Sequence, residues 1–543
     1  MELSIATALA ALPWLLYWPM LRLWWTFDDL FHQHLLVTGP RLWYLWDAEF
    51  YRHAAPKMMT PLLFLSLDLD RRLFGLHPVG FYAHQLVSLS LVGAALYAVL
   101  RLWLPRGWSA LGSGLFLLGA PVAGTALQLM VRHYFEALVL MAVAVALWVG
   151  ALRGQERRAP ALAWASAAVW FLACLAKEIA VPLVLFLPLV PEVEPRGRGR
   201  LFFPYGVAAV AYAALRVYLL GGPAPPSGFA VSGVGWLRLA MALPAKVATS
   251  IGGLSGAAGW GLLATVLAGL VAALALGRGS AFRTGAGLAL AMAPVLPVST
   301  VFEPRFALMS WLAVAIAGAF AGAAWSTRGQ TPRRAAIAVA LVAVGLGALV
   351  NRQAWADGFG ESLRRSAEGR YFVSMKAGEL VRRPAGLPAE LGELRWFREQ
   401  YLGLPRGAGW FLDDLYLCLH PETGPVAGWD ALSRRMVDLT WQVPAIRHRY
   451  CEAIRWRAPL RVEIRAEGAA TSWDLGPYGE GQYDFVWEEG TSALAMPRVG
   501  SFHARLPSDR ALRVRYQAPE GWVTYSPDLT VDLARSPLFR WSR

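Results

Sequence analysis

Long apolar stretches alternate with short charged segments over the first 350 residues of the chain. A membrane-spanning helix needs about 20 mostly apolar residues, and eleven stretches approach that length. The first is not typical of a cleavable signal peptide, because it lacks a basic start and a small-residue cleavage site. The segment 236–277 fits either one span or two. The predicted spans are residues 3–23, 78–100, 108–127, 134–152, 160–176, 179–191, 201–220, 250–277, 284–301, 306–326 and 335–350.

The pattern changes in the last part of the chain, residues 351–543. Apolar residues recur at helical spacing over 352–405. From about residue 458, polar and apolar residues alternate between turns rich in Gly and Pro, which is typical of antiparallel strands. The predicted fold class is therefore a polytopic α-helical membrane domain, residues 1–350, followed by a soluble α+β domain, 351–543, that is β-rich after about 458. Its Trp and Tyr residues either fill a small β core or stack on sugars, and acceptor recognition or shielding of an active site is our hypothesis for this domain.

Composition supports the division into two parts. The 543 residues are 56% hydrophobic and 16% charged, whereas soluble domains carry about 25% charged residues. Residues 1–350 hold 25 Lys and Arg against 13 Asp and Glu, and residues 351–543 hold 26 against 24. The net charge of +14 does not indicate nucleic acid, because the basic residues lie in short loops beside spans, where they face anionic lipid headgroups.

Basic residues also predict the orientation of the chain. Every second loop is basic, and such loops are typical of the cytoplasmic side. The amino terminus is then cytoplasmic, and an odd number of spans places the last domain outside the inner membrane of a bacterium, in the periplasm. A second span within 236–277 would move that domain to the cytoplasm. The basic loops contain Arg101 and Arg106; Arg153, Arg157 and Arg158; Arg196, Arg198 and Arg200; Arg278 and Arg283; and Arg328, Arg333 and Arg334.

The opposite face gathers charged residues at the ends of apolar stretches. Charges in or beside spans are expensive and are functional candidates by default. Arg and Lys suit a phosphate at the level of the lipid headgroups, and a carboxylate takes a proton from a hydroxyl or binds a metal. The alternative is a set of interhelical ion pairs and interfacial anchors. The set comprises Asp28, Asp29, Arg132, His133, Glu136, Lys177, Glu178, Arg216, Glu303 and Arg305.

Four stretches resemble the GT-C superfamily of integral-membrane glycosyltransferases, in particular the bacterial relatives of protein O-mannosyltransferases. The chain departs from the family in the second span, where the family often has His and Asn and this chain has only His84 and Gln85 in nearby register. Together the motifs cover about 300 residues in the order expected of the family. The four stretches are Phe27-Asp28-Asp29; Thr60-Pro61-Leu62-Leu63 continuing through residues 71–81; residues 176–182, preceded by Arg132 and Glu136; and residues 215–222 paired with residues 303–308.

The resemblance implies a sugar donor linked to polyprenyl phosphate, attacked with inversion by an acceptor hydroxyl of a protein, glycan or lipid. By motif match, Asp28 is the expected catalytic base, with Asp29 as its neighbour or a metal ligand. Glu136, Glu178, Glu303 and His84 are the expected supporting residues. Some relatives need a divalent cation such as Mg²⁺ or Mn²⁺, and the sequence does not decide this. The expected binders of the leaving phosphate are Arg132, Lys177, Arg216 and Arg305.

Other interpretations of the same residues remain. Asp28 and Asp29 with His32 and His34 are suitable ligand types for a metal in the first outer loop, about 24–77. A non-enzymatic transporter or flippase for a lipid-linked substrate would use the same cations, but no internal repeat supports it. A relative that has lost activity is a third interpretation.

Two features fall in the last domain. The acidic pair Asp413-Asp414 is expected to mark a helix or strand end. Cys418 and Cys451 can form a disulfide if this domain lies outside the membrane.

Overall fold

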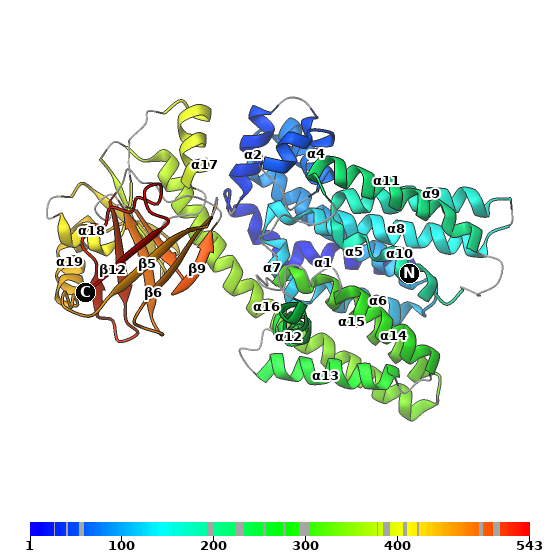
Figure 1. The fold of residues 1–543 in the computed structure, drawn as a ribbon. Coiled ribbons are helices and arrows are strands. Elements are labelled where there is room, and N and C mark those ends of the chain that lie inside the picture. The colour runs from blue at the N-terminus through cyan, green and yellow to red at the C-terminus, as the bar shows by residue number, and fades with distance from the viewer. Residues whose placement is uncertain are drawn as a thin grey trace. The chain divides into compact units, whose positions relative to one another are not determined.

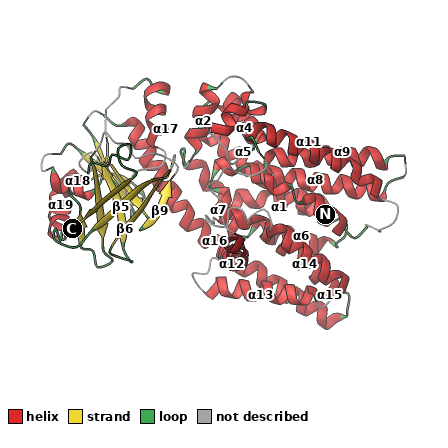
Figure 2. Ribbon diagram, viewed as in Figure 1, coloured by secondary structure: helices red, strands yellow, loops and turns green. Residues whose placement is uncertain are grey.

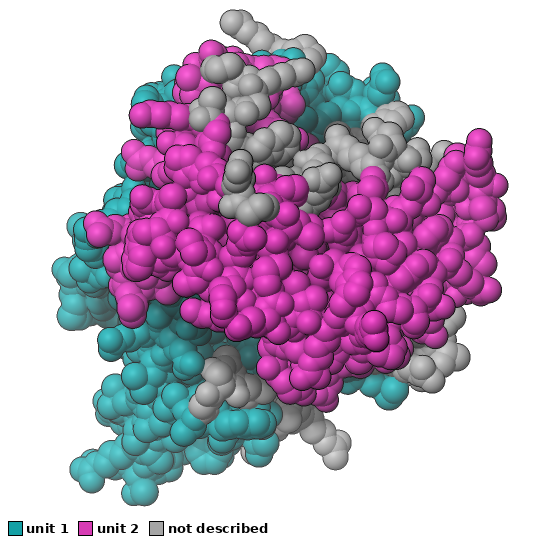
Figure 3. Space-filling model, turned by 90° about the vertical axis from the view of Figure 1, so that its left-hand side faces the viewer, with its two compact units in different colours: residues 1–23, 35–362 teal, residues 24–34, 363–543 magenta. Residues whose placement is uncertain are grey.

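A computed structural model describes most of the chain, and its residues fall into two compact units (Figure 3). The helical unit comprises residues 1–23 and 35–362, and the C-terminal unit comprises residues 24–34 and 363–543. Each unit is described separately. The described residues are 1–26, 28–39, 42–53, 59–155, 157–192, 199–222, 233–252, 257–274, 278–292, 304–376, 378–383, 391–404, 410–420, 423–467, 470–487, 492–502 and 511–543.

Helices account for the first part of the chain, and strands occur only after residue 379 among the described residues (Figures 1 and 2). Seven helices in the described part are long and apolar enough to cross a membrane, or eight if one pair bent by 55° is a single span. The chain is therefore a polytopic helical protein with a C-terminal α+β region. The spanning segments are Glu2–Arg22 (α1 with η1), α5 (Pro78–Leu100), Leu129–Arg153 (η3 with α8, His133–Arg153), α9 (Ala159–Ala176), Gly199–Leu220 (η6 with α11, Phe203–Leu220), Arg305–Ser326 (η8 with α15, Leu308–Ser326) and α16 (Gln330–Ser374); the bent pair is α6 (Arg106–Leu117) with α7 (Ala120–Ala126).

These eight segments correspond to eight of the eleven spans that the sequence predicts. The other three stretches do not hold one of these seven or eight spans among the described residues. Over 179–191 the chain contains only η4 (Glu178–Ala180), α10 (Leu183–Phe186) and η5 (Leu187–Leu189), because Pro182 and Pro188 interrupt the helix. The region left open as one span or two holds α12 (Gly233–Gly252) and α13 (Ala257–Leu274). In the predicted span 284–301, α14 (Arg278–Met292) covers the described residues, and 293–301 lie outside them.

The last helix of the helical unit is much longer than its predicted span. α16 runs for 45 residues, far beyond residue 350, and the boundary between the two units falls within it. Near its middle, Asn351 donates to Tyr17 Oη at 2.6 Å and to the Gly119 carbonyl at 3.0 Å. These bonds anchor α16 to α1 and to the start of α7.

The C-terminal unit contains three four-stranded sheets. The first is mostly parallel, in the order β2 (Trp410–Leu412), β1 (Leu380–Arg382), β3 (Val426–Asp430) and β4 (Arg435–Asp438). The other two are antiparallel, in the orders β11-β10-β7-β8 and β12-β5-β6-β9. The latter strands are β5 (Arg461–Glu467), β6 (Ala470–Gly476), β7 (Gln482–Trp487), β8 (Ser492–Met496), β9 (Val499–Phe502), β10 (Leu512–Gln517), β11 (Val523–Tyr525) and β12 (Leu538–Ser542).

One apolar core holds the two antiparallel sheets together. Val462 and Ile464 of β5 pack with Phe485 of β7 and Val514 of β10, all fully buried. The alternation predicted over 461–465, 482–487 and 513–516 corresponds to β5, β7 and β10. Trp473 and Tyr483 belong to this core, so these aromatic residues fill the β interior rather than form a sugar platform.

Candidate functional site

The helical unit contains a buried ion pair where α8 begins. Arg132, the residue before α8, is 0% exposed, and its Nη1 contacts Asp70 Oδ2 on α4 (Pro61–Phe74). The same Nη1 lies 3.4 Å from Ser66 Oγ, one turn earlier on α4. Because a buried charge is costly unless it is paired, this contact fixes α4 against the start of α8.

Asp70 has a second partner, His84 of α5. The His84 Nδ1 lies 2.7 Å from Asp70 Oδ1, so the two carboxylate oxygens accept from two different donors. Arg132 Nη1 lies 2.5 Å from His84 Nδ1, so the guanidinium contacts both the carboxylate and the imidazole. Three elements, α4, α5 and the start of α8, thus meet at Asp70.

Glu136, one turn after Arg132 on α8, extends this cluster. Its Oε1 accepts a hydrogen bond of 2.5 Å from Ser66 Oγ. Ser66 therefore bridges the second carboxylate and the Arg132 guanidinium. The Asp70 cluster, as we call it, consists of Asp70, Ser66, His84, Arg132 and Glu136.

One edge of the Arg132 guanidinium lacks a partner in the described part of the chain. Nε and Nη2 are buried and have no hydrogen-bond partner among the described residues. These two N–H groups point from the same side of the guanidinium, and such a pair binds two oxygens of a phosphate or carboxylate side by side. Buried donors are nearly always satisfied, so this edge is a candidate site for an anionic oxygen ligand.

A second cluster surrounds Glu178, at the junction of α9 and η4. Lys177 Nζ lies 3.2 Å from Glu178 Oε2, and Arg216 Nη1 of α11 lies 3.2 Å from Oε1. The Met59 backbone N–H donates to the same Oε1 at 3.1 Å. Lys177 also lies 5.2 Å from the ring centroid of Tyr134, two residues after Arg132. The Glu178 cluster, comprising Lys177, Glu178 and Arg216, thus carries more positive than negative charge.

The fourth predicted cation belongs to the same region. Arg305, in η8 (Pro304–Ala307), donates to Gln128 Oε1 at 2.8 Å. The Gln128 carbonyl accepts from Gln85 Nε2 of α5 at 3.2 Å. Arg305 is close enough to Lys177 for their charges to interact. Glu303 lies outside the described residues.

An apolar cavity of about 400 Å³ extends along the helices that carry these clusters. Leu138 of α8, Leu183 of α10 and Met309 of α15 line it, only two to five residues along the chain from Glu136, Glu178 and Arg305. Other lining residues reach Trp103, beyond the far end of α5. Leu138 and Glu136 lie within one turn of each other along α8.

Asp28 and Asp29 belong to the C-terminal unit, at the start of α2 (Asp29–Thr38). Their side chains differ in exposure. The Asp28 side chain is exposed, whereas Asp29 is buried and accepts from the Thr26 backbone N–H at 2.9 Å. His32 Nδ1 is within 2.8 Å of the Asp28 carbonyl. Burial lowers the pKa of His32, which therefore favours its neutral form.

His34 faces away from a shared loop site. Its ring stacks on Trp396 of α17 (Leu391–Trp396), with centroids 4.6 Å apart. Among the residues that the structure describes, no group of three or more His, Cys, Asp or Glu side chains is arranged to hold a metal ion.

In the C-terminal unit, the acidic pair marks a helix end, as predicted. Asp413 is the N-cap of α18 (Asp414–Leu419) and accepts from the Tyr416 N–H at 2.9 Å. Its other oxygen is 2.8 Å from Arg515 Nη1. Asp414 instead pairs with Arg382 at 2.6 Å.

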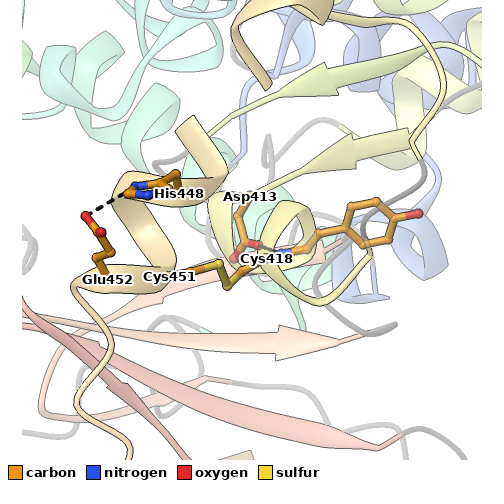
Figure 4. Close-up of a disulfide and its surroundings, with 6 residues drawn as sticks. Asp413, Cys418, His448, Cys451 and Glu452 are labelled. Carbon is orange, nitrogen blue, oxygen red and sulfur yellow. Dashed lines mark hydrogen bonds and ion pairs between the residues drawn. A yellow bond between two sulfur atoms is a disulfide. The ribbon is translucent and has the colours of Figure 1, made fainter. Parts of the chain in front are cut away.

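The two cysteines of this unit form a disulfide (Figure 4). Cys418 of α18 and Cys451 of α19 (Val443–Glu452) are joined across 33 residues, with Cα atoms 5.8 Å apart. His448 and Glu452 form an ion pair of 3.2 Å on the same helix. The disulfide fastens α18 to α19.

Sequence reasoning missed Asp70, Ser66, Gln128 and the Met59 backbone. Asp70 had a usable signal. It lies three residues after Leu67 and seven after Leu63, which places it on the buried face of α4. An acidic residue in an apolar register of this kind is a candidate for a buried pair.

No family model matches the chain, and no curated protein matches it. Among solved structures, the crystal structure of ArnT from Cupriavidus metallidurans bound to undecaprenyl phosphate is similar, with a TM-score of 0.40 and 14% sequence identity. The similarity covers 80% of this chain and 96% of that chain.

Proposed function

We propose that this protein is a membrane glycosyltransferase of the GT-C type. It moves a sugar from a polyprenyl-phosphate-linked donor to an acceptor hydroxyl. The observation that carries the proposal is the buried edge of Arg132, whose Nε and Nη2 have no acceptor among the described residues. A phosphate diester supplies two oxygens of the spacing that this edge binds.

The nearby cations fit the change in charge during transfer. When the bond between the sugar and the phosphate breaks, the phosphate becomes a monoester and gains negative charge. In this proposal Lys177, Arg216 and Arg305 stabilise that charge, and such electrostatic stabilisation is usually the largest catalytic term. Glu178 holds Lys177 and Arg216 in place before the donor binds.

The apolar cavity supports a lipid donor over a soluble one. Its lining comes from six helical elements, and among the described lining residues only Arg283 is charged. A hydrocarbon chain gains about 25 cal/mol for each Å² of surface removed from water. A lipid with its phosphate at Arg132 can therefore place its chain in this cavity.

Asp28 is our proposed catalytic base. Its exposed carboxylate can accept a proton from the acceptor hydroxyl, whereas Asp29 is engaged by Thr26. We propose that the reaction takes place on the outer face of the inner membrane. The disulfide between Cys418 and Cys451 supports an oxidising location for the C-terminal unit.

Binding of polyprenyl phosphate to the purified protein in nanodiscs tests the proposed donor site. We expect Arg132→Lys to weaken binding about 10- to 100-fold, because Lys cannot form the bidentate contact. Arg153→Lys, at the other end of α8, is the matched control and retains wild-type affinity. Equal binding by wild type and Arg132→Lys would show that Arg132 does not bind the donor phosphate.

Transfer of labelled sugar to acceptor separates an enzyme from a carrier. Wild type is expected to transfer sugar from a panel of polyprenyl-phosphate donors, and Asp28→Asn is expected to bind donor without transferring it. Movement of donor across the bilayer without transfer would instead identify a lipid transporter.

A further inference from the structure

The edge of one antiparallel sheet in the C-terminal unit carries an exposed Arg-Trp-Arg sequence. Residues 453–455 run parallel to β11, which is itself the edge strand in the order β11-β10-β7-β8. The Arg455 N–H donates to the Val523 carbonyl at 2.6 Å. Arg455, Trp456 and Arg457 are all exposed, so this edge displays two cations and an indole from a hydrogen-bonded backbone.

Guanidinium groups lie over the aromatic rings around this edge. The Arg455 guanidinium is 5.0 Å from the ring centroid of Trp522. The Arg543 guanidinium is 4.6 Å from the centroid of Trp456 and 5.7 Å from that of Trp541. Cation–π contacts within about 6 Å are attractive and favour fixed positions for these groups. The Trp–Arg edge, as we call it, consists of Arg455, Trp456, Arg457, Trp522, Trp541 and Arg543.

The Trp–Arg edge has an excess of positive charge. Among the described residues, none of its three arginines forms an ion pair. The nearest carboxylates along the chain on either side are already engaged, Glu452 by His448 at 3.2 Å and Glu463 by Arg540 at 2.9 Å. Glu520 is exposed in the adjoining turn between β10 and β11. Three cations therefore share this edge with one remaining carboxylate.

Trp and Arg side by side suit the surface of a lipid bilayer. Trp is enriched at the membrane–water interface, and arginine is attracted to anionic headgroups. Trp456 is 46% exposed, which leaves much of an apolar ring in contact with water. The chain itself crosses the membrane, and the boundary between its two units falls within α16. Such a tether keeps the edge near the headgroups, so that even a weak contact is populated.

We propose that the Trp–Arg edge docks on the membrane that the chain spans. Its arginines contact the headgroups of anionic phospholipids, and Trp456 lies at the level of the interface. The contact depends on charge and needs no particular headgroup. It weakens with salt, because the screening length falls from about 10 Å at 0.1 M to about 3 Å at 1 M. This inference does not rest on sugar transfer, and it predicts which side of the C-terminal unit faces the lipid.

Two serines at opposite edges of one sheet are matched reporters of this contact. Ser542 lies in β12, next to Arg543, and Ser501 lies in β9, at the other edge of the sheet β12-β5-β6-β9 (Figure 1). Both side chains are exposed, and the edges are three strand spacings of about 4.8 Å apart. Each serine is replaced by Cys and labelled with a polarity-sensitive fluorophore in the full-length protein in nanodiscs.

The lipid composition of the nanodisc is the first variable. An equal mixture of phosphatidylcholine and anionic phosphatidylglycerol is compared with phosphatidylcholine alone. We expect the label in Ser542→Cys to emit at shorter wavelength in the anionic nanodiscs, and the label in Ser501→Cys to emit equally in both. Salt at about 1 M should abolish the difference. The same emission in both compositions, or an equal shift at both labels, would overturn the proposal.

Removing charge from the edge is the second variable. Arg455→Gln with Arg457→Gln should lower the ratio of docked to undocked protein about 30-fold, because each arginine near an anionic surface contributes about fivefold. Arg434→Gln with Arg435→Gln removes two exposed arginines from the start of β4 and the turn before it, so it is the matched control and should keep the wild-type shift. Equal shifts in both double variants would contradict docking through this edge.

Replacement by Lys separates a membrane surface from a shaped binding site. Arg455→Lys with Arg457→Lys retains the charge and should retain the emission shift. Loss of the shift in this variant would indicate a partner that needs bidentate contacts, such as an acidic glycan, and would overturn membrane docking. None of these results depends on a sugar donor, so failure here leaves the proposed function untouched.

Discussion

The Arg216 guanidinium lies 3.2 Å from Glu178 Oε1, although 38 residues separate them in the chain. Lys177 approaches the other oxygen of the same carboxylate, and its side chain is only 13% exposed. One carboxylate therefore balances two largely buried cations from different helices. In the absence of a ligand, Glu178 is the group that keeps these cations together.

Removing the charge of Glu178 should lower the thermal stability of the protein. It should also increase the stabilisation that polyprenyl phosphate gives. Glu178→Gln leaves two partly buried cations without their counter-ion, and breaking a buried pair costs about 3–5 kcal/mol. We expect a lower melting temperature in detergent. Because an added anion replaces the missing charge, polyprenyl phosphate should raise the melting temperature of this variant more than that of wild type.

Glu192→Gln is the matched control for this prediction. Glu192 accepts from Trp103 at 2.7 Å and from Arg153 at 2.8 Å, away from the Glu178 cluster. This variant should also melt earlier, but its response to polyprenyl phosphate should equal that of wild type. The same ligand response in all three proteins would contradict the role of Glu178 as a stand-in for phosphate.

The proposed orientation can be tested with single cysteines. Leu432, in the turn between β3 and β4, is 96% exposed. Gly107, the second residue of α6 and next to a loop predicted to be cytoplasmic, has open space around it. In intact cells, Leu432→Cys should react with a membrane-impermeant maleimide, whereas Gly107→Cys should react only after permeabilisation. Labelling of Gly107→Cys alone in intact cells would reverse the orientation. The native free cysteine, Cys174, is buried and contributes little background.

Arg398 caps the carboxyl end of the long helix α16. It lies in the π-helix η9 (Phe397–Tyr401) and is 5% exposed. Its Nη1 donates to the carbonyls of Phe372 and Val373 at 3.0 Å, and its Nη2 donates to that of Met375 at 2.7 Å. Arg398→Met leaves these carbonyls without a donor and should cost about 3 kcal/mol.

Hydrogen exchange of residues 370–376 measures this loss of stability at the end of α16. Arg398→Lys retains the favourable charge at the helix end but makes fewer hydrogen bonds, so its exchange should be intermediate. Arg370→Met, on the exposed side of the same helix end, should exchange as wild type does. Wild-type protection in Arg398→Met would show that the capping contacts contribute nothing.

The sequence predicted the helices better than the pairs between them. Predicted span 78–100 coincides with α5 because the apolar stretch is long and has clear ends. The four cations were predicted because charge is conspicuous at the ends of apolar helices. Their partners were not, since Asp70 lies 62 residues from Arg132 in a loop region predicted to be outside the membrane. Gln128 contributes a neutral amide, which carries no such signal.

The buried carboxylate Asp413 should make the C-terminal unit less stable as pH rises. Arg515 contacts Asp413 at 2.8 Å and Asp484 at 2.7 Å, so one guanidinium serves two buried carboxylates. Burial raises the pKa of Asp413 to about 6, whereas an unfolded Asp has a pKa of about 3.9. The folded unit therefore holds a proton that the unfolded chain has released. This contribution is complete below about pH 4 and is lost as pH rises through about 6, at a cost of about 2–3 kcal/mol.

Hydrogen exchange of β7 and β10 between pH 4 and pH 7, corrected for intrinsic rates, should show this decline in wild type. Asp413→Asn should remove most of the slope, and Asp528→Asn, which removes a half-exposed carboxylate, should keep it. A slope that persists unchanged in Asp413→Asn would assign the pH dependence to another group.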